Sequence, residues 1–165
     1  MALFSALIPG VLVGGMSADY FGGYKGKGMM NALTLCCIYG FFASIFSLIL
    51  SVTFEKTRFI IFCWFFYFFG ACIMPISSGI IISCVPKHAQ NSASAFYGIF
   101  MNILGLSLAP VISGHIMEQY TNKKEGMIHG YRILLYAGPV LLVLFIMARS
   151  IVLSHLKRMK QEQRD

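Results

Sequence analysis

Residues 29–52 carry no charged side chain at any of 24 consecutive positions. A helix of that length rises about 36 Å, which is more than the thickness of a bilayer's hydrocarbon core, about 30 Å. Similar apolar runs occupy residues 1–18, 59–85, 93–117 and 131–153. The sequence therefore predicts an all-α, polytopic helical membrane protein with five transmembrane helices.

Composition and charge agree with this class. The chain has 165 residues, of which 58% are hydrophobic and 12% charged, far from the balance of a soluble domain. Its acidic residues all lie between or beside the apolar runs, at Asp19, Glu55, Glu118, Glu125, Glu162 and Asp165. We expect a transmembrane bundle over residues 1–154, a polar loop over 118–130 and a basic tail over 155–165.

A net charge of +7 is compatible with two kinds of binding partner, nucleic acid and lipid. Nucleic-acid binding needs a basic stripe or face, whereas these residues are scattered over separate loops and a short tail. We therefore expect the lipid bilayer, with its anionic headgroups, as the partner and no nucleic acid.

Five spans place the two termini on opposite sides of the membrane. One side then carries Lys25, Lys27, Lys87, Arg149, Lys157, Arg158, Lys160 and Arg164, and the other carries Lys56, Arg58, Lys123, Lys124 and Arg132. Cytoplasmic loops are richer in Lys and Arg, so the tail is predicted to be cytoplasmic. Whether the membrane is the plasma membrane or an endolysosomal one stays open. Residues 1–5 lack the basic start of a cleavable signal peptide, so the first run is expected to remain in place.

The sequence offers no chemistry for an enzyme or a metal centre. Its cysteines all fall in apolar segments, without the paired spacing of a zinc site, and are expected to be small buried hydrophobes: Cys36, Cys37, Cys63, Cys72 and Cys84. Neither a Gly-x-Ser-x-Gly nor a His-Glu-x-x-His motif occurs, and the carboxylates are peripheral. We predict no enzymatic activity, no metal and no cofactor.

A glycine-rich turn separates the first two apolar runs. It reads Gly15-x-x-x-Asp19-x-x-Gly22-Gly23-x-Lys25. Gly15 would let two helices touch, Gly22 would permit a tight reversal, and Asp19 would meet the positive end of a helix dipole. The alternative is that glycine and lysine are what any membrane-surface turn uses.

This turn resembles the one between the second and third helices of each half of the major facilitator superfamily, G-x-x-x-D-R-x-G-R-R. The resemblance implies a conformational latch formed by Gly15, Asp19, Gly22 and Lys25. Tyr20 stands where the family usually has arginine, so Asp19 lacks its neighbouring cation unless Lys25 substitutes.

Two further segments resemble helix signatures of the same superfamily. Residues 105–114 are similar to its G-x-x-x-G-P-x-x-G-G pattern, with Ala109 and Ser113 in place of glycines. Residues 75–79, Pro-Ile-Ser-Ser-Gly, are a related string. Helix bends or gates are therefore expected at Pro75, Gly79, Gly105, Pro110 and Gly114, although proline in a membrane helix can equally set a static shape.

Residues 83–96 are similar to the turn between the tenth and eleventh helices of spinster-type lipid transporters, and residues 22–27 also fit that subgroup. The resemblance implies that this chain corresponds to about helices eight to twelve of such a transporter. An alignment to helices two to six is the competitor. There the family often places an arginine in the fourth helix, and none interrupts residues 59–85.

Polar side chains within the predicted spans are candidates for a substrate cavity. Asn102 is the most conspicuous, because an amide in hydrocarbon must find a partner, either another helix or a substrate. The other candidates are Tyr67, Ser77, Ser78 and Ser107. The aromatic cluster at 64–69 is interpreted as packing or interface anchoring, with a ligand cage as the alternative.

The resemblance implies transport of a small organic or lipid-like solute by alternating access. In that reading this chain is an incomplete half bundle that needs the remaining transporter helices or another membrane subunit. The alternative is a small multi-span subunit that scaffolds a membrane assembly without transport activity.

Overall fold

The computed structural model describes the chain apart from residues 1, 25–26, 54, 121–122 and 163–165, and the described part is helical without a strand. The all-α class is confirmed there. Its elements are α1 (Ala2–Tyr20), α2 (Lys27–Val52), α3 (Lys56–Ser83), a 3₁₀ turn η1 (Lys87–Ala89), α4 (Gln90–Met101), a π-helix η2 (Asn102–Leu108), α5 (Ala109–Glu118) and α6 (Lys123–Glu162).

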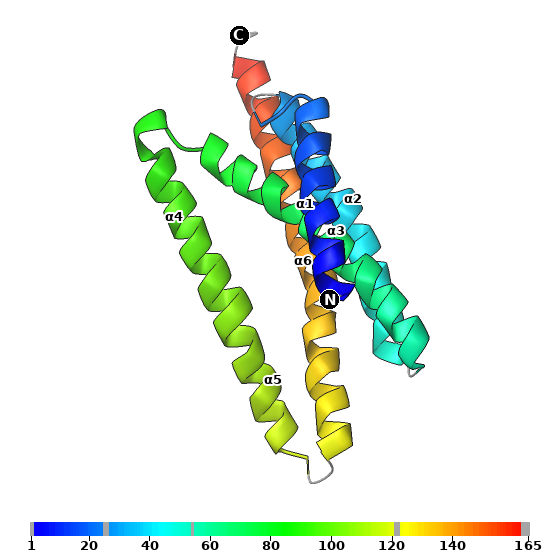
Figure 1. Cartoon of the computed structure of the whole chain (residues 1–165). Helices are drawn as coiled ribbons and strands as arrows, with labels where there is room; N and C mark the ends of the chain where they lie inside the picture. Colours follow the sequence, from blue (N-terminus) through cyan, green and yellow to red (C-terminus); the bar gives the residue numbers. More distant parts are fainter. Residues whose placement is uncertain (1, 25–26, 54, 121–122, 163–165) are drawn as a thin grey trace.

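Three helical segments are long and apolar enough to cross a membrane within the described ranges: Gly28–Val52, Lys56–Ser83 and Glu125–Ser154. The number of five spans stays a prediction. The α1–α2 turn, the α3–α4 turn and the C-terminal end of α6 lie at one end of the molecule, and the other two turns lie at the opposite end (Figure 1). The helices thus alternate in direction along the chain.

Helix α3 is in contact with both α1 and α2, and α6 packs against α2 (Figure 1). The core among α1, α2 and α3 contains Leu35 and Ile76, of which Ile76 is completely buried. Its other members have small side chains: Ala18, Ala32 and Cys36. Small residues let helix backbones approach closely, which substitutes for the hydrophobic effect where the surroundings are apolar.

The contact between α1 and α3 runs through glycine. A Cβ atom added at Gly10 would lie 2.6 Å from the Phe68 carbonyl oxygen, and one added at Gly14 would lie 2.7 Å from Cys72 Cα. Gly15, the glycine expected to let two helices touch, has no atom of another residue within 4 Å of such a Cβ. One residue along a helix is a rotation of about 100°, so the contact falls on Gly14 instead.

Stacked phenylalanines join α2 to α3. The Phe46 ring stacks on Phe65 and Phe69 at centroid distances of 5.2 and 5.7 Å, and Phe42 stacks on Phe69 at 5.2 Å. Offset stacking of this kind adds about 0.5–1.5 kcal/mol per pair beyond burial. These members of the aromatic cluster serve helix packing.

Helices α4 and α5 are parts of one rod interrupted by the π-helix η2. Pro110 is the second residue of α5, two residues after the end of η2. It has no N–H group to donate to the carbonyl four residues earlier, which accounts for the irregular segment. The bend expected at Gly105 and Pro110 thus coincides with a change of helix type, whereas Gly114 lies within regular α5. The rod meets α3 at its start and α6 at its end and diverges from the bundle between them (Figure 1).

The predicted polar loop over residues 118–130 is wrong, because α6 already begins at Lys123. Its glycines are contact positions and not loop residues. A Cβ atom at Gly126 would lie 2.8 Å from the Met117 carbonyl oxygen, and one at Gly130 would lie 2.8 Å from the Met117 side chain. Close packing of α5 on α6 therefore requires glycine at both positions. The basic tail also continues α6, to Glu162, as its helix-favouring Lys, Arg, Gln and Glu residues allow.

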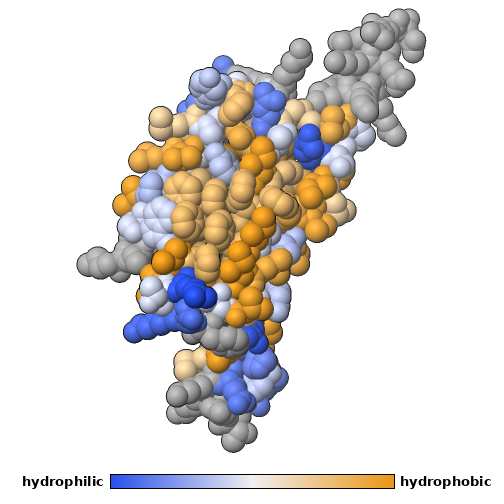
Figure 2. All heavy atoms as spheres, turned by 90° about the vertical axis from the view of Figure 1, so that its right-hand side faces the viewer, coloured by the Kyte–Doolittle hydropathy of each residue, from blue (hydrophilic) through white to orange (hydrophobic). Residues whose placement is uncertain are grey.

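Apolar side chains cover much of the outer surface. On α6, Val140, Leu144 and Met147 are 60%, 55% and 56% exposed. Figure 2 shows apolar residues gathered over the middle of one face, with hydrophilic residues towards its two ends. This distribution fits a helical bundle surrounded by lipid.

The cysteines are free, and most of them are sheltered. Cys36, Cys63 and Cys72 are buried as predicted and Cys37 is half-buried. Cys84 is exposed, contrary to the prediction, because α3 ends at Ser83 and leaves it in the turn.

Candidate functional site: the glycine turn and an apolar cavity

The glycine turn ends α1 with a Schellman motif. Gly23 N–H donates to the Ala18 carbonyl at 3.0 Å, and Gly22 N–H donates to the Asp19 carbonyl at 3.3 Å. These bonds satisfy carbonyls that the end of a helix leaves without intrahelical donors. Gly22 and Gly23 have φ values of +101° and +68°, which disfavour any side chain. The reversal assigned to Gly22 is thus a property of the backbone.

The first turn of α2 packs directly on this reversal. A Cβ atom at Gly28 would lie 2.7 Å from the Gly23 carbonyl oxygen, and closer still to that of Gly22. Asn31 Nδ2 donates to the Phe21 carbonyl at 2.9 Å, which caps another carbonyl at the end of α1. The turn and the start of α2 therefore hold one fixed geometry.

Tyr24 extends from the turn to α3. Its ring lies over Gly79, where a Cβ atom would come within 2.7 Å of Tyr24 Cε2, and its hydroxyl donates a long bond of 3.5 Å to the Pro75 carbonyl. Burial, followed by the nearby charge of Asp19, raises the pKa of Tyr24, so the phenol keeps its proton at neutral pH. The structure thus joins the turn to Pro75 and Gly79, which lie far from it in sequence.

Replacing Gly79 by alanine should displace the Tyr24 ring and cost about 1–3 kcal/mol of unfolding free energy, the usual effect of overpacking. Thermal unfolding in detergent would measure it. Gly70→Ala is the matched control, because no atom lies within 4 Å of a Cβ added there. In a Tyr24→Ala background, Gly79→Ala should no longer lower the free energy of unfolding. Equal effects of Gly70→Ala and Gly79→Ala would contradict the assigned contact.

The remaining latch candidates are placed less tightly. Asp19 is exposed in the last turn of α1, and Gly15 faces open space. Lys25 lies outside the described residues. Among the latch candidates that the structure describes, Gly22 is thus the one fixed by the reversal, and Tyr24 is a contact residue of the turn that sequence analysis missed.

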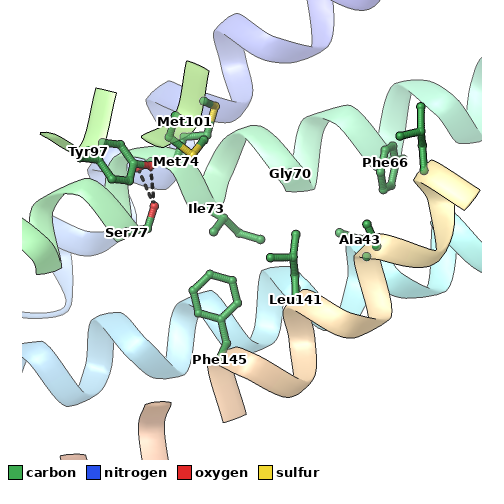
Figure 3. Close-up of a pocket in the computed structure, with 14 residues that line it drawn as sticks. Ala43, Phe66, Gly70, Ile73, Met74, Ser77, Tyr97, Met101, Leu141 and Phe145 are labelled. Carbon is green, nitrogen blue, oxygen red and sulfur yellow. Dashed lines mark hydrogen bonds between the residues drawn. The ribbon is translucent and has the colours of Figure 1, made fainter. Parts of the chain in front are cut away.

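A cavity of about 430 Å³ lies among α2, α3, α4 and α6. This volume is within the usual range of small-molecule sites. Figure 3 shows Ile73, Leu141 and Phe145 pointing towards one another at its middle, with Ser77 and Tyr97 at one end and Phe66 at the other. The lining consists of Gly40, Ala43, Phe66, Gly70, Ile73, Met74, Ser77, Tyr97, Met101, Leu134, Ala137, Gly138, Leu141 and Phe145.

The polar end of the cavity is a pair of hydroxyls. Ser77 Oγ donates to the Met74 carbonyl of its own helix at 3.0 Å, and the same oxygen lies 3.0 Å from Tyr97 Oη (Figure 3). Tyr97 comes from α4, so this pair also links α4 to α3. The cavity can hold an apolar body with one hydrogen-bonding group.

Among the cavity candidates from the sequence, Ser77 lines this space and the others do not. Tyr67 packs beside the buried cluster of Leu50, Cys63 and Leu135. Ser78 donates to the Pro75 carbonyl at 3.0 Å, and Asn102 donates to the Gly98 carbonyl of its own helix at 2.8 Å. Ser107 is exposed on the π-helix.

Most of the cavity wall was missed, because its residues are apolar and carry no signal of function in a sequence that is apolar throughout. Tyr97 had the one recognisable signal, a hydroxyl among small residues early in its predicted span. The described residues include no group of three or more His, Cys, Asp or Glu side chains placed to hold a metal ion.

Comparison of the chain with protein-family models, with curated proteins and with solved structures found no match.

Proposed function

We propose that this chain is part of a membrane transporter of the major facilitator type that moves a small organic or lipid-like solute by alternating access. The observation that carries the proposal is the apolar cavity among four helices, with the Ser77–Tyr97 pair at one end. Transporter sites lie between helices near the membrane midplane. The spinster-like subgroup, as implied by residues 83–96, is the form we favour.

In this proposal all five helical rods cross the membrane and the C-terminal end of α6 is cytoplasmic. The exposed apolar surface of α6 supports that arrangement. So does the grouping of the turns between helices at the two ends of the molecule (Figure 1). The remaining transporter helices, or another membrane subunit, would cover the outward faces of α5 and α6. The chain is not expected to transport alone.

Asp19 supports the latch. A carboxylate in the last turn of a helix faces the negative end of the helix dipole, which is unfavourable by about 0.3–1 kcal/mol. The stability of α1 therefore does not explain Asp19. We propose that it meets a cation or a helix N-terminus in one conformation of the complete transporter, with Lys25 as its companion.

Movement of an NBD-labelled monoacylglycerol tests the proposal. The tagged chain, purified in mild detergent together with the membrane chains that accompany it, would be reconstituted into vesicles, and dithionite quenching would report the probe's movement between leaflets. Ala137→Trp places a large ring in the cavity and should slow movement about tenfold, equivalent to ~1.4 kcal/mol of barrier. Val140→Trp, on the exposed face of the same helix, should not. Asp19→Asn should also slow it.

A scaffold subunit without transport activity is the second candidate, favoured by the broad exposed apolar face of α6. The same assay separates the two. Equal rates for the unmodified protein and Ala137→Trp, or no movement above that of empty vesicles, would overturn the transporter and favour the scaffold.

A further inference from the structure

None of the described residues that line the cavity has a charged group that could offset a charged ligand. Its lining has no Asp, Glu, Lys, Arg or His side chain, and Ser77 and Tyr97 supply its side-chain hydroxyls. Moving an ionised group into an apolar site without a partner costs many kcal/mol, so such groups stay in water or become neutral. A molecule that enters this space must be neutral where it touches the wall.

The protons of the hydroxyl pair can be assigned. Ser77 has one hydroxyl proton, and it is used in the bond to the Met74 carbonyl. Both contacts are satisfied together when Tyr97 donates to Ser77, so we assign the donor of this bond to Tyr97. Both protons are committed within the protein, and the lone pairs left over are acceptors. The polar end of the cavity therefore accepts a hydrogen bond and has none to give.

The cavity also has a direction. Between Phe66 and Ser77 α3 rises about 16 Å, so an elongated molecule can lie along it. Ser77 is close to the end of α3 at Ser83, and Phe66 is deeper in the helix. A ligand with its polar group at Ser77 and Tyr97 thus has its apolar part towards the middle of α3, the orientation that an amphiphile has in a bilayer leaflet.

We propose that the cavity selects neutral long-chain alcohols, or molecules that present a hydroxyl in the same way, over esters and carboxylates. The ligand hydroxyl donates to Tyr97 Oη. An ester or ketone offers only acceptors and meets the lone pairs of another acceptor, while a carboxylate adds a charge that nothing in the lining offsets. This inference rests on the proposed function, in that it takes the cavity as the substrate site.

Three probes with one polyene chain test the inference: cis-parinaryl alcohol, its acetate ester and cis-parinaric acid. Trp64, the one tryptophan of the chain, lies on α3 and transfers excitation energy to the polyene, so quenching of its fluorescence in nanodiscs reports binding. At alkaline pH the alcohol should bind about fivefold more tightly than the ester, the effect of one net hydrogen bond, and the acid should be weakest.

Two variants test the proton assignment. Tyr97→Phe should abolish the preference for the alcohol, and Tyr136→Phe, an exposed tyrosine outside the cavity, should keep it. Ser77→Ala releases the Tyr97 proton, so binding of the ester should improve. A role of Ser77 in folding alone would not raise affinity for one probe.

Equal affinities of alcohol and ester, or tightest binding of the acid, would overturn the inference and leave the proposed transporter intact. Absence of saturable quenching with every probe would overturn the inference and also remove the cavity as the substrate site. An ester affinity unchanged by Ser77→Ala would contradict the proton assignment.

Discussion

Replacing Gly14 by alanine should destabilise the bundle by about 3 kcal/mol, at the upper end of the range for overpacking. The added methyl would lie 2.7 Å from Cys72 Cα and also press on the Cys72 carbonyl, so it meets backbone and not a flexible side chain. Helix α3 is also packed against α2, which limits its movement away from α1. A thiol-reactive dye would measure the change, since Cys36, Cys63 and Cys72 become reactive on unfolding.

Gly15→Ala is the matched control, one residue away on the same helix. Nothing lies within 4 Å of its added Cβ, and alanine favours a helix over glycine by up to about 1 kcal/mol. We therefore expect opposite signs: a lower unfolding temperature for Gly14→Ala and an equal or higher one for Gly15→Ala. The same decrease for both variants would contradict the orientation of α1 on α3.

The second large effect is expected at Ser47, which is completely buried. Pro139 lacks an N–H group, so the carbonyl of Leu135, four residues earlier in α6, loses its intrahelical donor. Ser47 Oγ of α2 donates to that carbonyl. Ser47→Ala should leave a buried acceptor unpaired and cost about 1–3 kcal/mol in thermal unfolding.

A double-mutant cycle separates this bond from packing. Pro139→Ala restores an N–H group for Leu135, so Ser47→Ala should cost much less in that background. Ser44→Ala is the control on the same helix, because the Ser44 hydroxyl donates to Gly40 within α2. Equal costs of Ser47→Ala in both backgrounds would show that the Leu135 carbonyl does not depend on Ser47.

The sequence was sufficient for most of the helical segments and for the reversal at Gly22, because runs without charge and adjacent glycines are local signals. It was not sufficient for contacts between helices. Gly14 and Gly15 have the same chemistry, and only the rotation of α1 against α3 decides which one needs to be glycine. Similarly, Gly126 and Gly130 read as loop residues until Met117 is placed against them.

For the candidate site too, local signals in the sequence identified some residues, but contacts between helices decided which of them line the cavity. Ser77 was recognisable as a polar residue in an apolar run, and it lines the cavity. Asn102 had the stronger signal, yet its amide bonds to its own helix. The residues that give the cavity its shape, such as Leu141 and Phe145, come from a helix whose position no local pattern specifies.

The rod of α4, η2 and α5 has a mechanical consequence. It is supported at its two ends, by α3 and by α6, and it carries a π-helix between those supports. Tyr97 and Met101 form one wall of the cavity, and both lie on α4, the first helix of this rod. Bending the rod at η2 would move Met101, the residue directly before η2, while Tyr97 stays bonded to Ser77 of α3, so the volume of the cavity would change and its hydrogen-bond acceptor would keep its place.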